Sequence, residues 1–182
     1  MNRRLLLTAG TALTAPALAA LGGCASAPVP ADYAAEKPVL DLKSYFNGEL
    51  TAYGIFTDRS GRVVRRFTVL MMCSWQGNQG TLDERFTYSD GKTERRVWRL
   101  TDLGGGRYTG RADDVVGEAQ GQAAGNALNW RYTLRLPVDG QVYEVQFDDW
   151  MYLVDERVML NKASMSKFGF FLGEVTLSFT RK

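Results

Sequence analysis

The sequence predicts an all-β fold: an antiparallel up-and-down barrel of about 8 to 10 strands with a short helix near the C-terminus. From residue 46 onward, apolar and polar residues alternate with period two, as on strands that bury one face. Glycines and Asp-Gly pairs interrupt this alternation where tight turns would join sequential strands. A meander of this length must close on itself to protect its edges, so a barrel follows.

The expected elements can be assigned in order along the chain. The alternation predicts strands at residues 48–57, 62–75, 80–89, 92–101, 106–114, 126–137, 141–154 and 157–161, a helix at 163–169 and a last strand at 173–181. The apolar segment from Phe168 to Leu172 is expected to plug one end of the barrel. The alternative is an exposed loop that contacts a membrane surface.

The turn at Asp139-Gly140 fixes the register of one hairpin. A two-residue turn there pairs Leu136 with Tyr143, Leu134 with Val145, Tyr132 with Phe147, and Trp130 with Asp149 on one face. The opposite face then pairs Arg135 with Glu144 and Arg131 with Asp148. Apolar residues share one face and complementary charges share the other. This register directs Asp149 into the barrel beside Trp130, although Asp148 next to it points outward.

A second hairpin directs two more charges inward. A three-residue loop ending at Gly91 pairs Leu82 with Trp98 and Glu84 with Arg96. Because Leu82 and Trp98 are inward residues, Glu84 and Arg96 are expected on the same apolar face.

The inward charges need hydrogen-bonded partners or a wet cavity, because an unpaired buried charge is costly. In one interpretation the barrel is filled, and Glu84, Arg96 and Asp149 form a network joined by Asn161 and Tyr152. In the other, the barrel holds a small ligand and the charges orient its polar end. The walls of that pocket would be Phe86, Trp98, Trp130, Tyr132, Tyr143 and Phe147.

The N-terminus predicts export and a lipid anchor. Arg3 and Arg4 precede an apolar run that ends at Gly22-Gly23-Cys24. Residues 1–23 therefore resemble a bacterial signal peptide, and Cys24 lies at the position of a lipobox cysteine, the site of diacylation. An ordinary signal peptide with an incidental cysteine is the alternative, and the arginine pair also resembles a twin-arginine export signal.

The N-terminal prediction also sets the domain boundaries. Residues 24–39 are rich in Ala and Pro and are expected to form a lipidated tether, followed by a single β-barrel domain at 40–182. Ala25 replaces the Asp that usually signals inner-membrane retention. The expected location is thus the periplasmic face of the outer membrane, with the acyl anchor at Cys24 as the contact with the bilayer.

Composition excludes several classes of function. Without residues 1–23 the chain has 20 basic and 20 acidic residues, which argues against nucleic acid as a partner. The absence of histidine excludes a Ser-His-Asp triad and the usual zinc sites. Cys73 is expected to be a buried free thiol. A calcium site at the Asp113-Asp114 or Asp148-Asp149 pair is an alternative, but both pairs lack EF-hand spacing, so no metal or other cofactor is predicted.

Several short motifs together resemble the bacterial lipoprotein family called domain of unknown function 3833. They are Phe46 to Gly48, Leu50 to Gly54, Asp58 to Gly61, Arg65 to Phe67, Trp75 to Gly77, Thr81 to Glu84, Tyr88 to Gly91, Arg96 to Trp98, Asp148 to Met151 and Lys167 to Gly169. The resemblance covers nearly all of the chain after the signal peptide, and Asp148 to Met151 is its most specific part. It implies a lipocalin-like (calycin-like) barrel in the cell envelope and a role related to lipid.

Three functions are compatible with these features. The first is a binding module that holds or carries a fatty acyl group or another small apolar ligand inside the barrel. The second is a structural or interaction lipoprotein whose barrel is filled. The third is a lipid-acting enzyme with Asp149 or Glu84 as a general base, for which the sequence shows no accompanying nucleophile.

Overall fold

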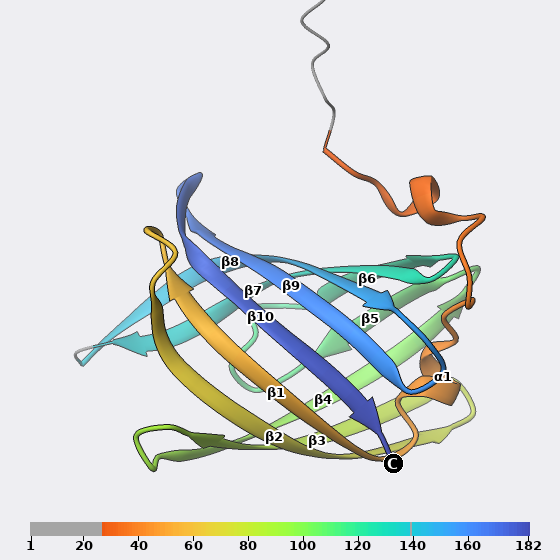
Figure 1. Ribbon diagram of the computed structural model, residues 1–182, viewed down its shortest axis with the longest axis horizontal. Helices are drawn as coiled ribbons and strands as arrows, with labels where there is room; N and C mark the ends of the chain where they lie inside the picture. Colours follow the sequence, from red (N-terminus) through yellow and green to blue (C-terminus); the bar gives the residue numbers. More distant parts are fainter. Residues whose placement is uncertain (1–26, 139) are drawn as a thin grey trace, which may run out of the picture.

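Ten antiparallel strands form one closed barrel (Figure 1). The structure is a computed structural model that describes residues 27–138 and 140–182. The strand order around the barrel is β1-β10-β9-β8-β7-β6-β5-β4-β3-β2, so neighbours in sequence are neighbours in space. Closure joins β1 to β10, from Leu50 opposite Arg181 to Asp58 opposite Gly173. The predicted up-and-down barrel is therefore confirmed.

The elements have the following bounds. The two helical segments are η1 (Pro30–Tyr33) and α1 (Leu42–Tyr45). The strands are β1 (Gly48–Asp58), β2 (Val63–Gln76), β3 (Gln79–Tyr88), β4 (Thr93–Gly104), β5 (Arg107–Arg111), β6 (Ala119–Ala124), β7 (Ala127–Val138), β8 (Gln141–Leu153), β9 (Val158–Lys167) and β10 (Phe170–Arg181). In the described part of the chain, no helix has the length and apolar character needed to span a bilayer.

Both predicted hairpin registers are confirmed. In the β7–β8 hairpin, Trp130 lies opposite Asp149, Tyr132 opposite Phe147, and Arg131 opposite Asp148. The outer pair is an ion pair, with 3.3 Å between Arg131 Nε and Asp148 Oδ1. In the β3–β4 hairpin, Leu82 lies opposite Trp98 and Glu84 opposite Arg96. The charges that the sequence directed inward thus face the barrel interior.

The predicted helix at 163–169 is wrong, because β9 continues through this segment. Met159, Asn161 and Ala163 are buried in alternation with exposed neighbours, and Phe168-Gly169 then forms a tight turn into β10. Ala, Met and Lys favour helices, but burial on alternate residues decides the conformation here.

Strand β6 was not predicted, because its residues are small and polar and have low strand propensity. Its glycine has a packing role instead. A Cβ on Gly121 would lie 2.3 Å from the Trp130 ring, and a Cβ on Gly110 in β5 would lie 2.6 Å from the same ring. Glycines on two neighbouring strands therefore make room for one inward tryptophan.

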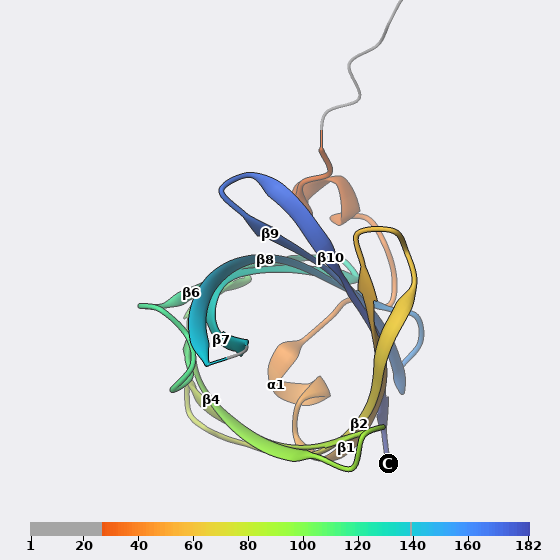
Figure 2. The same ribbon diagram turned by 90° about the vertical axis from the view of Figure 1, so that its left-hand side faces the viewer.

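One end of the barrel is closed by α1, which the sequence analysis did not predict. Asp41 is the N-cap, and its carboxylate accepts a hydrogen bond of 3.0 Å from Lys43 N. The Tyr45 hydroxyl donates to the Phe179 carbonyl at 3.2 Å, and Trp75 Nε1 donates to the Phe46 carbonyl at 2.9 Å. Figure 2 looks into the opposite end and shows α1 down the barrel. An N-terminal helix thus forms the cap.

Part of the segment predicted as a tether lies against the barrel. The Tyr33 ring in η1 is 5.7 Å from the Trp150 ring and 5.3 Å from the Tyr152 ring, between centroids. Leu40 N donates to the Gly125 carbonyl at 2.8 Å. The signal peptide and Cys24 lie outside the described residues.

The buried core is contained in the barrel and its cap, from Leu40 to Phe179. All ten strands and both helical segments also lie within residues 27–182. The core and the elements that the structure describes therefore lie together in this range.

Candidate functional site

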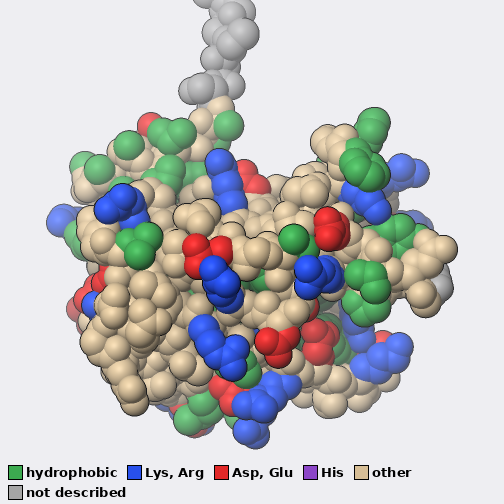
Figure 3. Space-filling model, turned by 180° about the vertical axis from the view of Figure 1, so that it is seen from behind, with side chains coloured by type: hydrophobic (Ala, Val, Ile, Leu, Met, Phe, Trp, Pro, Cys, Tyr) green, Lys and Arg blue, Asp and Glu red, His purple; other side chains and the backbone are tan. Residues whose placement is uncertain are grey.

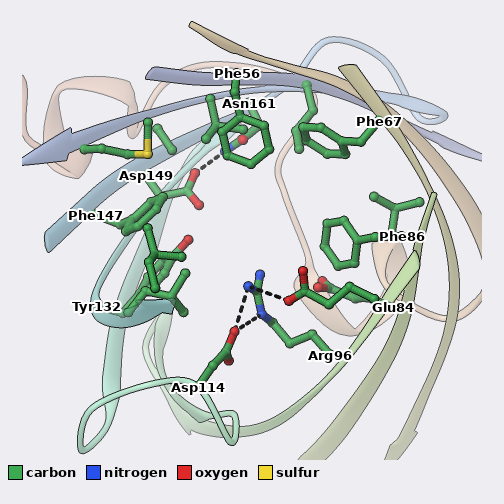
Figure 4. Close-up of a pocket in the computed structure, with 18 of the residues that line it drawn as sticks. Phe56, Phe67, Glu84, Phe86, Arg96, Asp114, Tyr132, Phe147, Asp149 and Asn161 are labelled. Carbon is green, nitrogen blue, oxygen red and sulfur yellow. Dashed lines mark hydrogen bonds and ion pairs between the residues drawn. The ribbon is translucent and has the colours of Figure 1, made fainter. Parts of the chain in front are cut away.

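The barrel encloses a cavity of about 1100 Å³. Small-molecule pockets are typically about 300–1,000 Å³, so this cavity is slightly larger than that range. Its walls are mainly aromatic and aliphatic, and Figure 4 shows Phe56, Phe67, Phe86 and Phe147 around the space. The cavity contradicts the interpretation in which side chains fill the barrel.

The two ends of the cavity differ. Leu42 of α1 and Phe46 close one end. At the other end the lining residues come from the tips of hairpins, including Thr57, Lys92 and Val138. Figure 2 is viewed from this second end, which we call the mouth. The cavity is thus capped by α1 at one end and lined by hairpin tips at the mouth.

Arg96 is the centre of the first polar group inside the cavity. Its guanidinium makes two contacts of 2.8 Å with Asp114 Oδ2, through Nε and through a terminal nitrogen (Figure 4). Glu94 Oε1 lies 3.9 Å from the same guanidinium. Burial alone would lower the pKa of Arg96, but the charges of Glu84 and Asp114 raise it. Arg96 is therefore a permanent cation whose strongest hydrogen bonds are already formed.

Asp114 reaches Arg96 because the segment between β5 and β6 folds along β7. Arg135 N donates to the Asp114 carbonyl at 2.8 Å, and Val116 N donates to the Thr133 carbonyl at 2.9 Å. The other carboxylate oxygen, Asp114 Oδ1, is buried without a hydrogen-bond partner among the described residues. The sequence analysis did not place Asp114 in the site, because no periodicity marks which of two adjacent aspartates turns inward.

Glu84 faces the cavity beside Arg96. Its carboxylate has no hydrogen bond, and no cation within 4.0 Å, in the part of the chain that the structure describes. Burial raises the pKa of Glu84 to about 7, although the positive charge of Arg96 opposes this rise. The side chain is enclosed by the barrel wall but keeps some surface toward the cavity. Glu84 is thus a hydrogen-bond acceptor that a ligand can reach.

Asp149 and Asn161 form the second polar group. The Asn161 side-chain amide donates to Asp149 Oδ1 and also to the Trp150 carbonyl, the latter at 3.2 Å. Burial raises the pKa of Asp149 to about 7, and the hydrogen bond from Asn161 opposes the rise. Both side chains line the cavity, and Asp149 is 7% exposed. A second carboxyl group that titrates near neutrality therefore faces the same space.

The aromatic wall near these groups is closely stacked. The Tyr132 and Phe147 rings are parallel within 8°, with centroids 4.9 Å apart, and Trp98 meets the Trp130 ring edge to face at 5.7 Å. Burial raises the pKa of Tyr132 well above its ordinary value, so its hydroxyl stays neutral. Two tryptophans thus lie where occupancy of the cavity would change their fluorescence.

Nearly all of the predicted pocket residues line the cavity: Glu84, Phe86, Arg96, Trp98, Trp130, Tyr132, Phe147, Asp149 and Asn161. Tyr143 does not, because its hydroxyl donates to Gln141 and the ammonium group of Lys167 lies 4.2 Å from its ring centroid. Tyr152 does not join the polar network either, since it contacts Tyr33 outside the barrel. Whether the lining residues bind a ligand stays a prediction.

The described residues contain no group of three Asp, Glu or Cys side chains placed to hold a metal ion. Glu84, Arg96 and Asp114 form one polar group inside the cavity, and Asp149 with Asn161 forms a second; Asp58, Arg65, Lys92, Glu94 and Arg135 also line the cavity. The single network expected from sequence is wrong in this respect.

The sequence matches the family described as "Protein of unknown function (DUF3833)" over residues 18–181, and the chain belongs to this family. This confirms the resemblance seen in its motifs. No curated protein matches the chain.

Among solved structures, the chain is similar to a protein of unknown function from the DUF3598 family of Nostoc punctiforme PCC 73102. The TM-score is 0.56 and the identity 14%, over 81% of this chain and 51% of that one. This chain therefore spans about half of that protein, and the likeness concerns the fold alone. A structure of EF1p2_mFAP2b bound to DFHBI has a TM-score of 0.43 and 11% identity, over 77% of this chain and 99% of that one. That similarity is too low to bear on function.

Proposed function

We propose that this DUF3833 protein binds an elongated apolar ligand, such as a lipid with a fatty acyl chain, inside its barrel. The observation that carries the proposal is the cavity of about 1100 Å³, with apolar walls, one closed end and one open end. Each methylene that leaves water contributes about 0.8 kcal/mol, so an acyl chain along these walls would supply most of the affinity.

The polar groups in the cavity restrict the polar end of the ligand. Glu84, Asp114 and Asp149 face the cavity interior with the Arg96 guanidinium beside them, and Asp58, Glu94, Arg65, Lys92 and Arg135 also line the cavity. Asp114 already occupies two donors of that guanidinium. A free carboxylate placed beside Glu84, Asp114 and Asp149 would therefore meet mainly negative charge, and the Arg96 guanidinium would be only partly available to it.

A polar end that donates hydrogen bonds suits this site better. A hydroxyl, an amide or an amine could donate to Glu84, whose carboxylate has no other partner among the described residues. We therefore favour acyl lipids with a hydroxyl or amide end, such as monoacylglycerols, and long-chain alcohols and amines as model ligands.

The sequence supports a location for this activity. The lipobox-like segment before Cys24 favours an acyl anchor, and Ala25 favours the outer membrane. We propose that the barrel takes up its ligand at the periplasmic face of that membrane.

A fluorescence titration tests the binding proposal. Residues 27–182 would be titrated with a long-chain alcohol, a long-chain amine and a monoacylglycerol, with the emission of Trp98 and Trp130 as the signal. A saturable change is expected for each ligand. Ala163→Phe, which adds a ring to a lining position that is 2% exposed, should abolish it.

A replacement variant and a control variant complete this test. Val175→Phe places a ring at another lining position, so it replaces Ala163→Phe if that variant fails to fold. Leu103→Ser changes an exposed residue outside the cavity and should bind as the unchanged protein does. Equal binding by folded cavity-filling variants would place the ligand elsewhere and contradict the proposal.

A further inference from the structure

The tip of the β9–β10 hairpin exposes four large apolar side chains in five consecutive residues. Phe168 is 84% exposed and Phe170 is 75% exposed. Phe171 and Leu172 follow at 49% and 42%. The hairpin projects beyond the barrel wall (Figure 1), so the prediction that these residues plug the barrel is wrong. A cluster of this kind on a protein surface marks an interaction site.

The backbone conformation at Phe168 is a second, independent observation that indicates an interaction site at the hairpin tip. Its φ is 52°, in the left-handed region, and the following Gly169 has a φ of 79°. Two-residue hairpin turns with positive φ at both positions favour Asn, Asp or Gly at the first. A bulky aromatic residue is strained there, and an exposed ring gains little packing in return. The chain thus keeps a ring at the tip at a cost to its own stability.

The tip lies beside the mouth of the cavity. Met165 and Leu172, on the two strands of this hairpin, both line the cavity. Two other hairpins at the same end also expose aliphatic residues, Val63 and Val64 at the start of β2, and Val142 near the start of β8. Figure 3 shows hydrophobic side chains next to Lys and Arg side chains at this end of the molecule, on the right. The apolar surface is therefore continuous with the entrance.

Cations accompany these apolar residues. Lys167 Nζ lies 5.3 Å from the Phe168 ring centroid, and Arg59, Arg62 and Arg66 are exposed in and beside the β1–β2 turn. Two acidic residues at this end are in ion pairs, Asp58 with Arg62 and Asp90 with Arg65. Of the cations named here, Lys167, Arg59 and Arg66 have no ion pair among the described residues. Aromatic and aliphatic side chains interleaved with Lys and Arg suit the interface of an anionic bilayer.

The orientation of the chain agrees with such a contact. In Figures 1 and 2, η1 and the β9–β10 tip lie toward the same side of the barrel. The chain before η1 leads back to Cys24, the predicted acyl site. A single surface could therefore meet the anchor and the hairpin tip together.

We propose that the tip of the β9–β10 hairpin docks on a phospholipid bilayer and places the mouth of the cavity at the lipid surface. Phe168 and Phe170 would enter the region between head groups and acyl chains, and Lys167 would stay at the head groups. This goes beyond the binding of a ligand, because it assigns a surface and a route by which the ligand enters.

Sedimentation with vesicles tests the docking. Residues 27–182, which lack Cys24 and hence any acyl anchor, would be mixed with unilamellar vesicles of phosphatidylethanolamine and phosphatidylglycerol. We expect the protein to sediment with the vesicles, and the double variant Phe168→Ser, Phe170→Ser to lose about tenfold or more in partition coefficient. Leu103→Ser, which removes an exposed residue at the closed end, is the matched control and should partition normally.

The outcomes separate this proposal from the binding proposal. Unchanged partitioning of the double variant would overturn the docking, as would a wild-type chain that stays in solution. Loss of self-association rather than of vesicle binding in the double variant would identify the tip as a contact between copies instead. Titration with soluble ligands needs no vesicle, so binding in the cavity can succeed or fail by itself.

Discussion

The two ends of the barrel use the same residue types for opposite purposes. At the closed end Tyr45, Phe46 and Trp75 are covered by the barrel wall, and Tyr45 and Trp75 donate hydrogen bonds to backbone carbonyls. At the mouth, Phe168 and Phe170 are exposed and one of them has a strained backbone. Aromatic residues therefore stabilise the fold at one end and form an accessible surface at the other.

Replacing a phenylalanine by alanine at each of the two ends should give the largest difference in the free energy of unfolding. Phe46→Ala removes a 3% exposed ring that packs edge to face on Phe179, so we expect it to lower the free energy of unfolding by about 3–5 kcal/mol. Phe170→Ala should change it by about 0.5 kcal/mol or less. Urea denaturation of both variants measures this contrast, and a large loss at Phe170 would mean that the tip is part of the core.

Two carboxyl groups in the cavity should make the free energy of unfolding depend on pH. The pKa values of Glu84 and Asp149 are raised to about 7, so between their ordinary values and pH 7 the folded state binds more protons than the unfolded state. Stability should therefore fall as pH rises from 5 to 8, by on the order of a few kcal/mol. Urea denaturation at both pH values measures the change.

The matched control for this pH effect is the double variant Glu84→Gln, Asp149→Asn. It keeps the shape of both side chains but removes their titration, so its stability should change much less between pH 5 and 8. Asp58 has a pKa lowered to about 2, mainly by the hydrogen bond from Ser60. Its titration therefore changes the stability only at pH values below this range. A wild-type protein that is more stable at pH 8 than at pH 5 would contradict the burial of these groups.

The same two carboxyl groups should make ligand affinity depend on pH according to the charge of the ligand. As they lose protons between pH 6 and 8, a long-chain amine should bind about tenfold more tightly and a long-chain carboxylic acid more weakly. A neutral long-chain alcohol should change little and serves as the control. Fluorescence titrations at the two pH values measure these affinities. A carboxylic acid that binds better at pH 8 would contradict the proposed acceptor site.

The smallest expected effect concerns the strained turn. Phe168→Asn places a residue that favours a left-handed conformation at φ 52°, so the domain should become more stable by about 0.5–1 kcal/mol while vesicle binding weakens. Thermal unfolding and vesicle sedimentation of the same variant measure the two effects. If the substitution destabilised the domain, the phenylalanine ring would have a role in folding.

The sequence predicted the inward charges because hairpin register leaves few choices. One tight turn at each of two hairpins, with apolar residues required on a common face, was enough to place Glu84, Arg96 and Asp149 inside. The predicted aromatic walls follow from the same registers. These are local constraints, and they can be read from strands that are neighbours in the chain.

The features that the sequence did not predict depend on distant contacts or on small residues. Asp114 reaches Arg96 only because its loop bonds to β7, and β6 consists of residues with no strand preference. The cap α1 had one readable signal, the N-cap Asp41 before two apolar positions. The size of the cavity could not be predicted, because alternation shows which side chains face inward but not the space they leave.

Native mass spectrometry tests the central claim, an occupied apolar cavity, most directly. Residues 27–182 would be purified from cells without detergent, weighed intact and then extracted with organic solvent. We expect a bound species of one-to-one stoichiometry that contains an acyl chain, is absent from the Ala163→Phe variant and is retained by Leu103→Ser. A protein that carries no adduct and takes up none from long-chain alcohols, amines or monoacylglycerols would contradict it.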